Sequence, residues 1–321
     1  MNARATSPTN QRYEIARQLF RWTAFPVTLA LSLWVASIVW ARTGDLTQAF
    51  VIPSTGAALF ILLLERIFPF RSQWNTGHGD TAVDVAHFFS VQATSYGAEI
   101  VITALLVPAA IALRQHAALS LWPSGLPVFA DLALALVVAE FPKYWVHRKS
   151  HEWDWLWRFH SVHHSVPRLY WFNAYRFHPV DIGLDTMVGL GVVALLGCRP
   201  EVLALFAVVT AVHGFFQHSN LDLRLGPLNW VFSMAELHRW HHSRVMDEAN
   251  NNYGNNLIVW DIVFGTRYLP TDREPPIDIG LSGLSAFPQT FVGQLLAPVT
   301  WKRIREASIA AESAARHTKL Q

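Results

Sequence analysis

The chain has 321 residues, of which 52% are hydrophobic and only 15% are charged, whereas soluble domains are usually about a quarter charged. Its 25 Lys and Arg nearly balance 23 Asp and Glu, and the absence of a long basic run argues against a nucleic-acid partner. The single cysteine excludes a disulfide framework and an iron–sulfur cluster. Composition therefore indicates a membrane protein whose redox chemistry, if any, uses other ligands.

Apolar segments predict the membrane-spanning helices in chain order. About twenty residues cross the hydrocarbon, and the following segments approach that length: 25–41, 48–65, 94–113 and 126–146. Two shorter segments, 182–197 and 201–217, are separated only by residues 198–200, which predicts a tight helical hairpin. We expect an all-α membrane protein with about four to six transmembrane helices.

Four acidic residues interrupt these apolar segments: Glu99, Asp131, Glu140 and Asp185. A charge within a membrane span usually faces the protein interior, because exposure to lipid is costly. We therefore expect all four side chains to point inward.

The distribution of Lys and Arg predicts the orientation. The N-terminal segment, the 66–93 loop, the 143–181 segment and the chain after 217 hold 22 of these residues. The intervening loops hold one each: Arg42, Arg114 and Arg199. We expect both termini and the long loops on the cytoplasmic side of the inner membrane, and we interpret the first apolar run as a signal anchor.

Three clusters of histidine follow the fourth apolar segment. They are HRKSH (His147, His151), HSVHH (His160, His163, His164) and HRWHH (His238, His241, His242). Residues three and four apart share one helix face, so each cluster presents its rings to one point, as metal ligands do. By chance, H-x-x-H-H would occur about 0.03 times in such a chain, yet it occurs twice. Ordinary interfacial or packing roles are expected instead for the isolated His78, His87, His116 and His317.

The predicted hairpin brings the clusters together. Residues 165–237 separate the second cluster from the third, which fits an excursion through the membrane and back. His178 precedes the hairpin, and His213 and His218 lie at its end. A spacing of five places His213 and His218 about 140° apart on a helix. We expect His218 to be a metal ligand, and His178 and His213 to be ligands or to orient ligands.

The number of imidazoles exceeds what one zinc ion binds, so we expect two metals. The metalloprotease motif H-E-x-x-H is absent, because Trp155 follows His151 and Glu152 where its second histidine should stand. Imidazole alone does not choose among iron, copper and zinc.

The succession HRKSH, HSVHH, RFHP, HSN, HRWHH and NNYGNNLIVWDIVFGTRYLP, over about residues 130–270, is similar to the sterol desaturase and fatty acid hydroxylase family of integral-membrane di-iron enzymes. The resemblance implies a membrane core beneath a cytoplasmic histidine cap, two irons per chain, and oxygen-dependent hydroxylation or desaturation of a lipid. The eight clustered histidines match the family's iron ligands. HRWHH also resembles the branch that contains alkylglycerol monooxygenases.

The resemblance divides the chain into N-terminal membrane helices (1–125), a fatty acid hydroxylase-like catalytic region (126–270) and a cytoplasmic tail (271–321), with one structural domain overall and a helix expected over 288–321. It also implies a closing element that braces the cap without taking part in the chemistry. Its matching residues are Asn252, Tyr253, Gly254, Trp260, Asp261, Phe264, Gly265 and Thr266.

Two groups of residues surround the clusters. Tryptophans crowd the first two, at 145, 153, 155 and 157, and we interpret them as an interfacial belt, with a substrate-channel wall as the alternative. Six arginines also surround the clusters, at 148, 158, 168, 176, 239 and 244. We interpret most of them as part of the excess of positive charge on the cytoplasmic side, and some could dock an acidic electron donor.

The sequence predicts two partners. The chain carries no credible flavin, nicotinamide or haem motif, so we expect an external electron donor: a ferredoxin, a cytochrome b5-like protein or a reduced pterin. We expect the substrate to be a membrane lipid such as a sterol-like, carotenoid, sphingoid or ether lipid, with hydroxylation preferred over desaturation. A histidine-rich metal transporter or sensor is the alternative function, but its ligands should lie near mid-bilayer.

Overall fold

The structure, a computed structural model, describes residues 8–116 and 121–319. Helices account for its regular structure, and three isolated bridges are the only β-type pairings in the described residues. The expected all-α fold is confirmed. The helices are α1 (Pro8–Thr43), α2 (Leu46–Ile67), α3 (Thr81–Val101), α4 (Val107–His116), α5 (Val128–Glu152), α6 (Asp154–His164), α7 (Pro179–Thr186), α8 (Val192–Leu196), α9 (Pro200–His218), α10 (Ala235–His241), α11 (Met246–Ala249), α12 (Val259–Val263) and α13 (Phe291–Lys319).

Short turns of other helix types complete the fold. Two π-helical turns, η2 (Ile102–Leu106) and η4 (Met187–Gly191), join α3 to α4 and α7 to α8 without a break. The 3₁₀ turns are η1 (Ser72–Asn75), η3 (Trp171–Tyr175) and η5 (Gly226–Trp230). The last helix, α13, confirms the helix expected over 288–321.

Five helical stretches of the described chain are long and apolar enough to cross a membrane, which agrees with the expected four to six. They are Glu14–Thr43, Leu46–Ile67, Thr81–His116, Pro179–Leu196 and Pro200–His218. The span expected at 126–146 is not among them. Its residues form α5, but Asp131, Glu140 and Lys143 make this helix too polar to qualify.

The hairpin expected around residue 198 is present, and local sequence explains its turn. Gly197 ends α8 in the left-handed conformation, with a φ of 96°, which glycine adopts without a steric penalty. Pro200 then occupies the first turn of α9, where its missing N–H costs nothing. The chain therefore reverses within three residues.

Helix α9 is the central element of the bundle. It contacts α1, α2, α5, α10 and η3, and it buries apolar side chains such as Val202, Val208, Val212 and Phe216 almost completely. A helix that is apolar all round is expected at such a position. The last residue of α9 is His218, so the centre of the bundle leads directly to the histidines.

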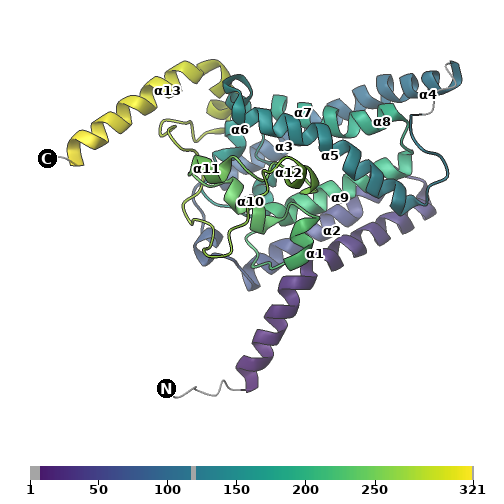
Figure 1. Ribbon diagram of the computed structural model, residues 1–321, viewed down its shortest axis with the longest axis horizontal. Helices are drawn as coiled ribbons and strands as arrows, with labels where there is room; N and C mark the ends of the chain where they lie inside the picture. The colour runs from purple at the N-terminus through teal and green to yellow at the C-terminus, as the bar shows by residue number, and fades with distance from the viewer. Residues whose placement is uncertain (1–7, 117–120, 320–321) are drawn as a thin grey trace.

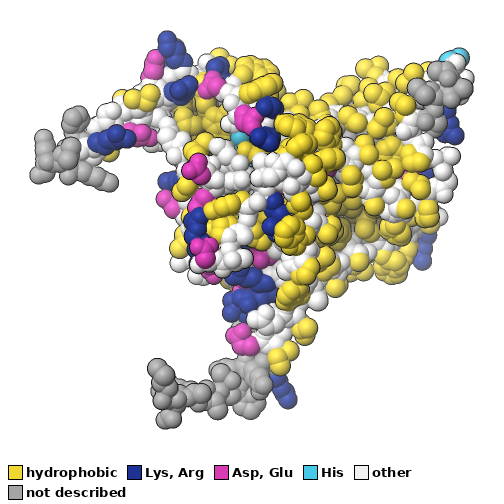
Figure 2. All heavy atoms as spheres, in the orientation of Figure 1, with side chains coloured by type: hydrophobic (Ala, Val, Ile, Leu, Met, Phe, Trp, Pro, Cys, Tyr) yellow, Lys and Arg dark blue, Asp and Glu magenta, His cyan; other side chains and the backbone are white. Residues whose placement is uncertain are grey.

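Figure 1 shows that the α1–α2, α4–α5 and α8–α9 connections lie at one end of the bundle, on the right, and that α6, α10, α11 and α12 gather at the other end. We call this second group of helices, with the loops between them, the cap. The alternation of the loops between the two sides of the membrane and the assignment of the cap to the cytoplasm both stay predictions. Figure 2 shows hydrophobic side chains over most of the bundle surface, with charged side chains concentrated near the cap, on α13 and at the start of α1.

The acidic residues of the apolar segments follow the expectation in three cases and contradict it in one. Asp131 is buried and accepts hydrogen bonds from Trp122 and Arg199. Glu140 is buried and accepts backbone N–H groups of the 255–256 segment, and Asp185 pairs with Lys143 at 2.9 Å. The prediction for Glu99 is wrong, because its side chain is exposed on α3.

Candidate metal centre

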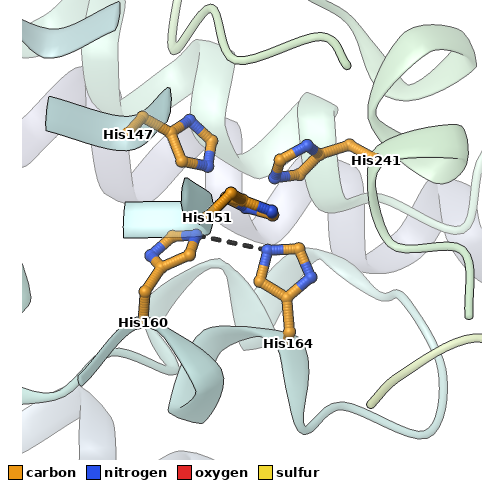
Figure 3. A group of neighbouring side chains, drawn as sticks. All are labelled: His147, His151, His160, His164 and His241. Atoms are coloured by element: carbon orange, nitrogen blue, oxygen red, sulfur yellow. Dashed lines mark hydrogen bonds between the residues drawn. The ribbon is translucent and has the colours of Figure 1, made fainter. Parts of the chain in front are cut away.

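Five histidines converge between α5, α6 and α10. Each offers one ring nitrogen, and these nitrogens all lie within 4.8 Å of one another. We call them the first histidine group: His147, His151, His160, His164 and His241 (Figure 3). The four-residue spacing on α5 and on α6 places two rings of each helix side by side, and α10 supplies the fifth ring from the opposite side.

The outer nitrogens of this group are held by hydrogen bonds. His147 Nδ1 lies 2.7 Å from the Tyr253 carbonyl oxygen, and His241 Nδ1 lies 2.7 Å from that of Asn251. A carbonyl only accepts, so both rings carry their proton on Nδ1. His160 Nδ1 lies 2.9 Å from Asp181 Oδ2. Each ring therefore turns its other nitrogen inward.

The inner nitrogens lack protein partners that could satisfy them. Nε2 of His147, His151 and His241 is buried and makes no hydrogen bond, which is costly unless another group is bound there. His160 Nε2 and His164 Nε2 lie 3.2 Å apart, as the dashed line in Figure 3 marks. Converging lone pairs of this kind are what a metal ion needs.

Four further histidines form a second histidine group, and all are buried: His163, His218, His238 and His242. His238 Nε2 lies 2.9 Å from Nε2 of both His218 and His242. One ring nitrogen cannot form a good hydrogen bond with both neighbours when all three expose lone pairs. Separations of about 3 Å are instead those of imidazoles around one metal with bonds of about 2.1 Å.

Burial keeps most of these rings neutral. Loss of hydration, followed by the proximity of other histidines, holds the pKa well below its ordinary value for seven of these rings: His147, His151, His163, His164, His238, His241 and His242. Neutral imidazole is the form that binds metals. The donor sets thus fit two metal ions held by nitrogen.

Comparisons with known proteins agree with this geometry. The model of the fatty acid hydroxylase family matches residues 132–266. The chain is 40% identical, over 250 residues, to ornithine lipid hydroxylase OlsE of Rhizobium tropici, with 77% of this chain and 74% of that protein covered. The chain belongs to the sterol desaturase and fatty acid hydroxylase superfamily. It is therefore an integral-membrane oxidoreductase.

Other superfamily members match over shorter stretches. Alkylglycerol monooxygenase of Danio rerio is 32% identical over 174 residues, which is 54% of this chain but only 38% of that protein. A very-long-chain aldehyde decarbonylase of Oryza sativa is 29% identical over 150 residues, or 54% of its length. No solved structure matches the chain.

From the sequence, His178 and His213 could be metal ligands or could orient ligands. The structure places neither in a histidine group. His178 caps α7: its Nδ1 accepts the Val180 N–H at 3.1 Å, and its Nε2 lies 3.2 Å from the Leu295 carbonyl. His213 is fully buried against the rings of Phe25 and Phe232, and neither ring nitrogen has a hydrogen-bond partner. The 140° offset from His218 explains why His213 points elsewhere.

The closing element of the superfamily contacts α10 and the loop after α12. Asn252, at a φ of 57°, donates its side-chain amide to the Leu237 and Tyr268 carbonyls. Asp261 accepts the N–H groups of Tyr253 and Gly254, both at 2.8 Å. This segment fixes the carbonyl groups that orient His147 and His241.

Sequence reasoning missed several residues that orient the ligands. Asp181 contacts His160, and the side chain of Asn173 lies 3.1 Å from His218 Nδ1. Trp157 packs its ring against His151 and His164. Asp181 lies three residues after His178, and a carboxylate near a conspicuous histidine is the one signal that could have indicated it.

Proposed function

We propose that the chain is a membrane-bound di-iron oxygenase that hydroxylates a C–H bond of a membrane lipid with O2 and external electrons. The observation that carries the proposal is the pair of histidine groups, whose inner nitrogens converge on one another and leave Nε2 of His147, His151 and His241 buried without a hydrogen bond. Nine imidazoles, with carboxylates confined to outer contacts, fit two borderline metal ions such as iron. Bound iron would supply the dioxygen activation that attack on an unactivated C–H bond requires.

The protein itself positions the ligand rings and excludes water from the site. Tyr253, Asn251 and Asp181 hold rings of the first histidine group in one orientation, as outer contacts do in metal sites. The second histidine group is buried, so water reaches it poorly. Because the rings stay neutral, the site places little charge beside an apolar substrate.

The proposed substrate is a lipid that reaches the cap from the membrane. The bundle beneath the cap presents an apolar surface, and the relatives bear the names of an ornithine lipid hydroxylase and an alkylglycerol monooxygenase. An amino-acid-linked or ether lipid is therefore the first class to test. The alternative of a metal transporter or sensor fits less well, because the histidines gather in the cap and not along a path between the membrane helices.

The test combines metal analysis with lipid analysis. We expect two irons per purified chain, and new lipid species that carry one added oxygen atom in cells that express the protein. His163→Ala and His241→Ala, one from each histidine group, should abolish this product and lower bound iron. His116→Ala is the matched control, since His116 is exposed at the end of α4 remote from the cap. Unchanged membrane lipids, or full activity in either cap variant, would contradict the proposal.

A further inference from the structure

A surface groove lies between α6 and α13. Its volume is about 480 Å³, and Arg158, Trp301, Lys302 and Arg305 are among the residues that line it. Helix α13 extends outward from the cap (Figure 1). The groove is therefore accessible from the polar end of the molecule.

The charges of the groove favour an acidic partner. Its three cations outnumber the two carboxylates with which they pair: Asp154 contacts Arg158 at 2.7 Å and Arg305 at 3.4 Å, and Glu306 lies 3.9 Å from Lys302. The Lys302 side chain is 90% exposed, and the neighbouring Arg303 is exposed as well. Exposed cations of this kind attract acidic proteins and speed their association.

The groove is also lined by exposed apolar side chains. Val299 is 85% exposed, and Ile309 is 61% exposed, although both line the groove. A small apolar patch with a charged rim is typical of the transient interfaces that redox proteins form.

Tryptophan side chains connect this groove to the histidines. Trp301, a groove residue, belongs to a buried cluster with Val162 and Phe287, and Trp157 packs against that cluster. The centroid of the Trp157 ring lies 5.2 Å from that of His151 and 5.3 Å from that of His164. Trp157 is partly exposed, so one aromatic ring spans the distance between the protein surface and the first histidine group.

We propose that the groove between α6 and α13 docks an acidic one-electron carrier protein. The electrons of the carrier then pass through Trp157 to the metal that the first histidine group would hold. This inference rests on the proposed function. In each transfer the carrier is oxidised by one electron and the metal site is reduced by one. Trp157 provides a short path, and none of its bonds forms or breaks.

The first experiment measures binding and does not depend on turnover. The full-length protein, metal-loaded and metal-depleted, is placed in nanodiscs of neutral lipid and titrated with an acidic [2Fe–2S] ferredoxin and with a soluble cytochrome b5 domain. Lys302→Glu combined with Arg305→Glu should raise the dissociation constant of the bound carrier about tenfold or more at low salt. Arg114→Glu, a charge reversal at the opposite end of the bundle, should leave it unchanged.

The second experiment separates electron transfer from docking. Trp157→Leu should keep carrier affinity but slow carrier-driven reduction, measured per bound iron, about tenfold, whereas dithionite should reduce the bound iron of variant and parent equally. Trp157→Phe should restore part of the rate.

The outcomes distinguish this inference from the proposed function. The inference would be overturned by unchanged carrier affinity in the charge-reversal variant, or by an unchanged carrier-driven rate in Trp157→Leu, while dithionite-supported hydroxylation continued. Absence of hydroxylation with every reductant would instead contradict the proposed function.

Discussion

At the scale of single residues, the rings are oriented by groups that are not themselves ligands. His160 is the clearest case, because its Nδ1 contacts the buried carboxylate of Asp181 at 2.9 Å while its Nε2 faces His164. The carboxylate fixes the protonated nitrogen and makes the other nitrogen a better donor. A side chain on α7 thus adjusts a ligand on α6.

Replacement of Asp181 tests this arrangement. Asp181→Ala should lower iron affinity about 10- to 100-fold, the usual effect of removing such a contact, while Asp181→Asn should lose less because its amide oxygen still accepts the N–H of His160. Iron retained during a chelator titration measures the effect. Asp247→Ala, at an exposed position, serves as the control. Equal iron retention in Asp181→Ala and the parent would show that Asp181 does not support the ligand.

The spacing of the histidines predicted which residues come together but not how they divide. HSVHH gives His160 and His164 to the first histidine group and His163 to the second, while HRWHH gives His241 to the first and His238 and His242 to the second. The last two histidines of each motif are adjacent in sequence, so their side chains point about 100° apart around the helix. Only the packing of α6 against its neighbours decides which ring faces which group, and sequence does not reveal that packing.

At the scale of elements, the closing segment after α11 connects helices that are distant in the chain. Its backbone carbonyls hold His147 of α5 and His241 of α10, and Asp261 holds the segment itself. Gly254 is required there, because an added Cβ would lie 2.3 Å from the Leu257 carbonyl oxygen.

Gly254→Ala should therefore displace this segment, lower the midpoint of thermal unfolding by several degrees and reduce bound iron. The cost of such a backbone clash is about 1–3 kcal/mol. Gly214→Ala on α9 is the matched control, since nothing lies within 4 Å of its added Cβ and alanine favours a helix. Thermal unfolding in detergent compares the two. Equal midpoints for both variants would show that the segment tolerates a side chain at 254.

The helices illustrate where sequence reasoning succeeds. Hydrophobic length predicted α2, α9 and a hairpin turn at residues 198–200, because each depends on local composition. It failed at Glu99, which lies exposed on α3, since the rule that charges face inward assumes neighbours on every side. Hydrophobic length also predicted a membrane span at 126–146 that the structure does not support. The charges of this segment are satisfied by partners distant in sequence, such as Arg199 and the 255–256 segment.

At the scale of the whole molecule, many buried imidazoles make stability depend on pH. In the unfolded chain each histidine has a pKa near 6.5, whereas burial holds seven of those in the cap well below that value. The unfolded state therefore binds more protons as pH falls through about 6.5, and the free energy of unfolding decreases.

The metal-depleted protein should accordingly lose thermal stability steadily between about pH 7.5 and 5.5. Bound metal should delay this loss until protons compete for the ligands. His163→Gln combined with His241→Gln, which removes two of the buried titrating rings, should give a shallower decline than the parent. Thermal unfolding across pH provides the measurement, and a flat profile for the metal-depleted parent would contradict the expectation.

The residues of the first histidine group are far apart in the sequence, so the ligand set becomes complete only late in translation. Its ligands come from α5, α6 and α10, and the carbonyl groups that orient His147 and His241 belong to Tyr253 and Asn251. During synthesis, α5 and α6 leave the ribosome long before α10 and the segment that follows it. An ion captured early would have an incomplete set of ligands and would exchange easily. Stable loading of the metal must therefore wait until translation has passed residue 253 and the hairpin of α7 to α9 has been inserted into the membrane.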